Sequence, residues 1–140
     1  MTALSEVRGL PVVTLDEARE VGVFDSVALD APAGRITHVR VTGRRRGSRT
    51  ALAWHCLHAI GPDAVLVESE VPPGSEQPAA PGEVLGSRVL SEDGDDRGTV
   101  RDVVFDPATG RVEKVLTTLG EVSGDRLLGL GEYALVVRRD

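Results

Sequence analysis

The chain has 140 residues, of which 41% are hydrophobic and 27% charged, and this balance is typical of a folded protein and excludes a disordered one. A single cysteine, Cys56, excludes an internal disulfide and every metal motif that is built from several cysteines. The formal net charge of −6 argues against a chain that binds nucleic acid with its whole surface, since such proteins are normally basic.

No segment has the composition of a membrane span or of a signal peptide. The apolar runs fall well short of the roughly 18 residues that a membrane-spanning helix requires. The first residues, MTALSEVRGLPVV, lack the basic and apolar regions of a signal peptide. We therefore expect a cytoplasmic protein without a membrane span.

The first half of the chain predicts short strands joined by turns. Val27 and Leu29 are apolar at a spacing of two, so they share one face of a strand. Gly34 tolerates the left-handed backbone that closes a hairpin, and the chain then returns as a second strand. A further strand, a short helical or turn segment around HCLHAIG and a last strand, AVLV at residues 64–67, complete this half.

A proline-rich linker follows. Half of the chain's 8 prolines lie in it, and such a composition is typical of an extended, exposed connection. The prolines concerned are Pro72, Pro73, Pro78 and Pro81. We divide the chain into a first repeat over residues 1–70, a linker over residues 71–82 and a second repeat over residues 83–140.

The second half predicts the same elements with clearer turn chemistry. Val103 and Phe105 are apolar at a spacing of two and lie in a predicted strand. In the following DPATG, Asp106 can accept hydrogen bonds from nearby backbone, Pro107 presets its own φ, and Gly110 tolerates a left-handed conformation. The sequence RVEKVL then predicts the returning strand of a hairpin.

The two halves are copies of one unit. GTVRDVVFDPATGRVEKV, residues 98–115, aligns with GVFDSVALDAPAGRITHV, residues 22–39. LHAIGPDAVLV, residues 57–67, aligns with LLGLGEYALVV, residues 127–137. Matching turns and matching apolar spacing together indicate an internal duplication, which decides how the whole fold is interpreted.

We expect the two copies to pack together. A repeat of about 70 residues buries only about 60% of the surface that its unfolded chain exposes, whereas a unit of about 140 residues buries about 68%.

Gly22 and Gly98 begin equivalent strands, where glycine indicates a bulge or a close backbone approach. The predicted fold is mostly β, with two tandem small β-barrel repeats of about five strands each, packed together, and short helical turns.

These motifs resemble the PRC-barrel domains. The resemblance rests on LGSRVLSEDGDDRGTVRDVVFDPATGRV in the second copy and on LHAIGPDAVLV in the first, and it covers nearly the whole chain apart from the linker. It implies small β-barrels that serve as interaction modules, and none of the shared motif residues is catalytic. The family includes parts of a photosynthetic reaction centre and of a ribosome-maturation factor, but we expect neither function to carry over.

The clearest difference between the copies is a loop rich in arginine. The span from Gly34 to Gly61 covers 27 positions and the span from Gly110 to Gly131 covers 21, and the excess falls around TGRRRGSRT. Such arginines can bind phosphate or carboxylate groups of a partner, but they are also typical of a solvated hairpin tip. The candidate partner-contact residues are Arg40, Arg44, Arg45, Arg46 and Arg49.

WHCLH, residues 54–58, combines a tryptophan, two histidines and the one cysteine. A metal site or a Cys/His nucleophile is one interpretation. A structural zinc site needs four ligands, however, and the one other histidine, His38, is distant in sequence. We favour the interpretation in which Trp54 and Leu57 belong to the core and the two histidines lie at the surface of a turn.

No segment predicts a catalytic site. SEDGDDRG lacks the length and the final glutamate of a calcium loop, and LGLGEY lacks the third glycine of a dinucleotide fingerprint. We therefore expect no enzyme, no catalytic, metal-binding or cofactor-binding residues and no cofactor.

The expected function is protein interaction. We predict an adaptor module that binds another protein, and exposed strand edges would also allow a homodimer. The alternative is a sensor that holds a small ligand in the cleft between the two barrels. Nucleic acid is disfavoured as a partner, because the chain has a negative net charge and only four aromatic residues.

Overall fold

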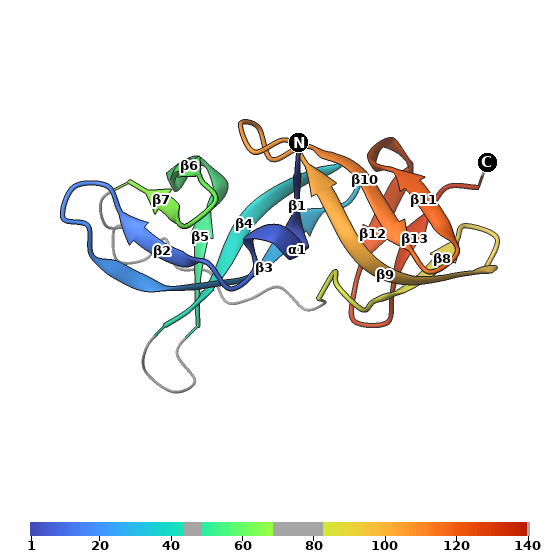
Figure 1. The fold of residues 1–140 in the computed structure, drawn as a ribbon. Coiled ribbons are helices and arrows are strands. Elements are labelled where there is room, and N and C mark those ends of the chain that lie inside the picture. The colour runs from blue at the N-terminus through green and yellow to red at the C-terminus, as the bar shows by residue number, and fades with distance from the viewer. Residues whose placement is uncertain (44–48, 69–82, 140) are drawn as a thin grey trace.

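The computed structural model describes residues 1–43, 49–68 and 83–139. Of these residues, 58% lie in strands and 8% in helical segments, which confirms the predicted mostly-β fold class. The strands form two small sheets, one from each repeat, that lie side by side (Figure 1). Within the described ranges, no helix has the length and apolar character needed to cross a membrane.

Among the described residues, the first sheet contains six strands. They are β2 (Pro11–Thr14), β3 (Glu20–Asp30), β4 (Arg35–Thr42), β5 (Arg49–Ala53), β6 (Leu57–Ile60) and β7 (Val65–Val67). Their order across the sheet is β5-β4-β3-β2-β7-β6. The β2–β7 pair is parallel and the other pairs are antiparallel, so the last strands of the repeat return beside its beginning.

The second repeat builds a sheet of the same order. Its strands are β8 (Arg88–Ser91), β9 (Asp96–Phe105), β10 (Val112–Thr117), β11 (Gly120–Ser123), β12 (Leu127–Leu130) and β13 (Ala134–Val137). Their order, β11-β10-β9-β8-β13-β12, reproduces the first sheet strand by strand. Each repeat has one strand more in this order than expected, because the segments expected to be helical or turns before AVLV and ALVV contain β6 and β12.

In the described parts of the chain, three helical segments of three or four residues accompany the strands. They are α1 (Leu4–Val7), η1 (Trp54–Cys56) and η2 (Gly124–Arg126), the last two being 3-10 turns. The segments η1 and η2 occupy equivalent places, each between an edge strand and the closing hairpin. The short helical turns of the prediction are therefore present.

The predicted turn chemistry is confirmed. Asp106 Oδ1 accepts a hydrogen bond from the Ala108 amide at 2.8 Å, and Gly110 has a φ of 79°. Gly34, its equivalent in the first repeat, has a φ of 66°. The pairing of β2 with β3 shifts register beside Gly22, and that of β8 with β9 shifts in the span that contains Gly98, as expected for bulges.

The N-terminal segment of the first repeat pairs with the sheet of the second. Strand β1 (Thr2–Ala3) is antiparallel to β9, with Thr2 opposite Phe105. In α1, which follows it, the Ser5 amide donates to Asp102 Oδ1 at 3.0 Å, and Leu4 is fully buried. This segment thus links the beginning of the chain to the middle of its second half.

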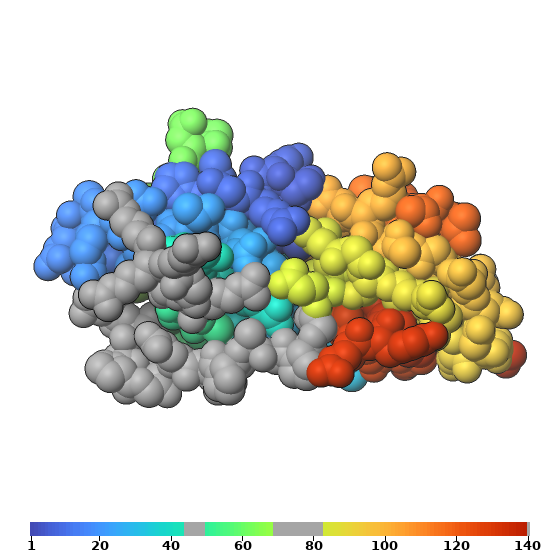
Figure 2. Space-filling model, turned by 90° about the horizontal axis from the view of Figure 1, so that it is seen from below, coloured from blue at the N-terminus to red at the C-terminus, as the bar shows by residue number. Residues whose placement is uncertain are grey.

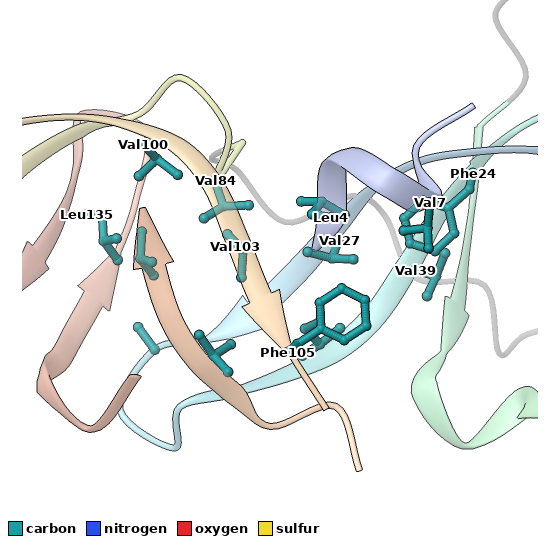
Figure 3. Packing of buried hydrophobic residues seen from close by; sticks show 14 of the residues in the cluster. Leu4, Val7, Phe24, Val27, Val39, Val84, Val100, Val103, Phe105 and Leu135 are labelled. Atoms are coloured by element: carbon teal, nitrogen blue, oxygen red, sulfur yellow. The ribbon is translucent and has the colours of Figure 1, made fainter. Parts of the chain in front are cut away.

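One hydrophobic core serves both repeats. Buried residues of β3 and β4, such as Val27 and Val39, belong to the same cluster as Val103 and Phe105 of β9 (Figure 3). In the view of Figure 2 the two repeats form one continuous body, with the N-terminal residues and the start of the second repeat near its middle. The prediction that the copies pack together is confirmed.

Candidate functional site

The two hairpin turns of the repeats meet at the boundary between the sheets. The Ile36 amide donates to the Gly110 carbonyl at 2.7 Å, and the Val112 amide donates to the Gly34 carbonyl at 2.8 Å. These bonds flank an antiparallel bridge between Arg35 and Arg111. Arg35 therefore pairs with Arg111, the equivalent residue 76 positions later in the second repeat. A two-fold axis between the repeats requires such a pairing.

Arg35 and Arg111 carry like charges at this axis. In an antiparallel pair without direct hydrogen bonds, the side chains lie on the same face with Cα atoms about 4.5 Å apart, and like charges placed so are destabilising. The Arg111 Nη2 atom is 3.2 Å from Asp125 Oδ1, which offsets one of the two charges. Arg35 is exposed and makes no ion pair within the described ranges.

A depression of about 430 Å³ lies between the repeats beside this pair of arginines. Its lining residues include Pro32, Gly34 and Arg35 of the first repeat and Arg111, Gly124 and Asp125 of the second. Polar groups from both repeats thus converge at one edge of the boundary, while its interior is filled by the shared core.

Trp54 lies across the same boundary at another place. Its ring meets that of Phe105 edge to face, with centroids 5.6 Å apart, and it packs against the core. A Cβ atom added at Gly110 would lie 3.0 Å from the indole Nε1 atom, so a larger residue there would require the indole to shift slightly. The expectation that Trp54 belongs to the core is confirmed, but its partners lie in the other repeat, which the strand pattern did not indicate.

The structure places the two described candidate arginines, Arg40 and Arg49, on different strands. Arg40 lies on β4 with 4% of its surface exposed, and its Nη1 atom is 3.3 Å from Glu83 Oε1 at the start of the second repeat. Arg49 begins β5, opposite Thr42. The prediction for residues 44–46 lies outside the described residues. Arg40 is therefore a buried contact between the repeats and not part of an exposed loop surface.

The histidines of WHCLH lie at the surface, as the favoured interpretation expects. His55 and His58 are exposed, and the His58 Nδ1 atom is 3.3 Å from Glu68 Oε1. Cys56 is a half-buried free thiol. In the part of the chain that the structure describes, no three side chains of metal-ligand type form a group that could hold an ion.

The two repeats differ in the residue types at equivalent hairpins. The turn between β10 and β11 presents Leu119, which is 71% exposed, where the first repeat has its arginine-rich loop. Tyr133, in the turn before β13, is 72% exposed, and its ring is 5.5 Å from the Arg88 guanidinium. Equivalent strands are thus joined by loops of different chemistry.

Comparison with known families gives a match over both halves of the chain. A family model described as PRC-barrel domain matches residues 1–70 and again residues 81–139. These two matches coincide with the two sheets and leave out most of the proline-rich segment. No curated protein matches the chain.

Proposed function

Because the chain belongs to the PRC-barrel domain family, with two tandem copies in one sequence, we propose that it is a non-enzymatic adaptor that binds another protein in the cytoplasm. PRC-barrel domains often mediate protein interactions. The polar residues that the sequence shares between the repeats form turns and strand contacts here, which supports a binding role over a catalytic one.

One observation carries this proposal: equivalent hairpins of a duplicated scaffold carry loops of different sequence. The strand orders of the two sheets are identical, and one core joins them. The loop between β4 and β5 is nevertheless rich in arginine, whereas the turn between β10 and β11 presents Leu119. A scaffold that keeps its core and varies its loops is suited to hold distinct contacts for a partner.

The arginine-rich loop is the contact that we propose to test first. Guanidinium groups bind carboxylate or phosphate groups through paired hydrogen bonds, so the favoured partner surface is acidic. Such contacts between exposed charges are screened by salt. We therefore expect partner binding to weaken as the salt concentration rises.

The experiment compares two variants that lose the same charge. The partner is first identified by affinity capture from the native host and then purified for titration at low and high salt. Replacing Arg44, Arg45 and Arg46 by serine should abolish the salt-sensitive binding, whereas replacing the exposed Arg101, Arg138 and Arg139 should preserve it. Equal binding by both variants would refute the role of the loop. A separate measurement, sedimentation of the free chain, tests whether it forms a homodimer.

A small-ligand sensor is the second candidate function. It is supported by the depression of about 430 Å³ between the repeats, a volume within the range of ligand sites. The filled core beneath it favours the adaptor instead, since the boundary leaves space at its edge and not at its centre. A small molecule from a host extract that raises the unfolding temperature of the pure chain would support the sensor.

A further inference from the structure

We propose that the depression between the two hairpin turns binds a carboxylate group of the partner protein, held by Arg35 and Arg111. This inference rests on the proposed function, because an adaptor for an acidic partner surface meets such a group. It names a second contact, since Arg35 begins β4 and the arginine-rich loop follows the other end of that strand. The charges of the lining and a difference between the repeats support it.

The lining of the depression has an excess of positive charge. It contains two arginines, Arg35 and Arg111, and one acid, Asp125, and its other residues are uncharged. A single carboxylate neutralises the remaining charge. A dianion such as phosphate would instead leave a negative charge beside Asp125, so the lining favours a monoanion.

The backbone keeps the two arginines together. Hydrogen bonds on both sides of the Arg35–Arg111 bridge fix the register of this pair. The two side chains therefore lie on one face, where like charges repel each other. A carboxylate bound between them attracts both guanidinium groups and relieves this repulsion.

One of the two arginines already has a carboxylate beside it. The Arg111 Nη2 atom lies 3.2 Å from Asp125 Oδ1. No carboxylate of the described residues lies within 4.0 Å of the Arg35 guanidinium. Asp30 stands opposite Arg35 in the β3–β4 pairing, but its Oδ1 atom accepts a hydrogen bond from the Ala33 amide at 3.2 Å. The turn therefore uses this carboxylate.

The internal symmetry explains the difference between the arginines. The segments η1 and η2 are equivalent, so His55 stands where Asp125 stands in the second repeat. Their surroundings correspond as well, since Asp125 lines its depression together with Pro32, and His55 lines one of about 200 Å³ together with Ala108, the equivalent of Pro32. The first repeat thus has a histidine in place of the acid, and a carboxylate for Arg35 comes from another molecule.

The donors at the site suit a planar carboxylate. A guanidinium group presents five N–H donors in a fixed plane, and its fork matches the two oxygens of a carboxylate. The contact with Asp125 engages one nitrogen of Arg111. The two arginines therefore offer donors from both repeats, and a bound carboxylate would join the two copies at their axis.

The first test is a titration of the full chain with the α-amide of N-acetylaspartate at constant ionic strength, followed through backbone amide chemical shifts. The α-amide of N-acetylasparagine is the uncharged control of the same shape. We expect shifts at Gly34, Arg35 and Asp125 with the aspartate probe alone. Arg35→Gln should weaken binding about three-fold. Arg101→Gln removes an exposed arginine outside the depression and should leave binding unchanged.

A second pair of variants tests the symmetry. His55→Asp gives the first repeat the acid that the second repeat has at Asp125, so it should compete with the probe and weaken binding about three-fold. His58→Asp adds the same charge at the other exposed histidine of this segment, beside Glu68, and should change binding less than about 1.5-fold. Equal effects of the two variants would contradict the equivalence of His55 and Asp125.

Three results would overturn the proposal: no shifts at the depression, equal binding by Arg35→Gln and Arg101→Gln, or tighter binding of inorganic phosphate than of the aspartate probe. A captured partner that Arg35→Gln retains in full would overturn the site and leave the adaptor function standing. A chain that binds the probe but captures no protein would instead refute the adaptor function and with it the assignment of the carboxylate to a partner. The two failures are therefore distinguishable.

Discussion

Two equivalent turns contain a left-handed residue, but only one of them uses glycine. In the turn between β8 and β9, Gly94 has a φ of 85° and donates to the Ser91 carbonyl at 2.9 Å. In the turn between β2 and β3, Ala18 has a φ of 53° and donates to the Thr14 carbonyl at 3.0 Å. The left-handed conformation costs about 1 to 2 kcal/mol for a residue with a Cβ atom, so the first repeat carries strain that the second avoids.

Exchanging the two residue types should change stability in opposite directions. We expect Ala18→Gly to stabilise the chain by about 0.5 kcal/mol, since the relief of strain exceeds the entropy that glycine adds to the unfolded chain. Gly94→Ala should destabilise it by about 1 kcal/mol, although the added Cβ would meet no atom within 4 Å. Urea unfolding of both variants measures these changes, and a lower midpoint for Ala18→Gly would contradict the interpretation.

The smallest elements lie where the repeats join. The segment of β1 and α1 comes from the first repeat, yet it covers β9 of the second through the Thr2–Phe105 pairing and the Ser5–Asp102 hydrogen bond. Isolated segments of this length form no stable structure in water, because a helix of one turn does not repay its nucleation. The burial of Leu4 in the shared core therefore holds this segment in place.

A matched pair of variants on α1 tests this role. Leu4→Ala removes a fully buried side chain and should lower the free energy of unfolding by about 3 kcal/mol. Glu6→Ala changes an exposed residue of the same helix and should alter it by less than about 0.5 kcal/mol. Chemical denaturation gives both values. Similar small losses for the two variants would mean that the segment adds little to the fold.

Strand β6 shows why one element per repeat escaped prediction. Its residues, Leu57–Ile60, are half-buried at both ends and exposed between them, so they do not alternate as a strand with one buried face does. The Leu57–Val67 and Ile60–Val65 pairs of the β6–β7 hairpin fix its conformation. The turn chemistry around Gly34 and Gly110, in contrast, was readable because each turn depends on its own few residues.

At the scale of the whole molecule, the two repeats of the chain are packed as a pseudo-symmetric pair. Equivalent residues pair across the axis at Arg35 and Arg111, Trp54 packs on Phe105 of the other repeat, and Arg40 contacts Glu83. The core continues through this boundary. Separation of the repeats would expose apolar surface on both, so they should unfold as one cooperative unit.

The isolated second repeat should therefore be much less stable than the full chain. A chain of residues 83–140 loses the cover of β1 and α1 on β9 and the contact of Trp54 with Phe105. In the full chain, the fluorescence of Trp54 and the circular dichroism of the strands should change at the same denaturant concentration. An isolated repeat that melts as cooperatively and at as high a temperature as the full chain would refute the shared core.

The candidate site was predicted only in part. The sequence singled out Arg40, just before the arginine-rich loop, as a candidate partner contact, but the structure buries it, because β4 turns this position toward the start of the second repeat. Arg35 drew no attention, since an arginine after a turn glycine is unremarkable in sequence. Its contact with Arg111 depends on a bridge between residues 76 positions apart. The alignment of the repeats does place these two arginines at equivalent positions, but it does not show that they meet.

The duplication, the mostly-β class and the turn positions follow from the sequence alone, because apolar spacing and turn residues act over a few neighbouring positions. The tertiary structure decided how the copies meet: the axis at Arg35 and Arg111, the segment that crosses onto β9 and the place of Trp54. These contacts join residues far apart in the chain, and their energies depend on burial and on charges that only the folded arrangement brings together.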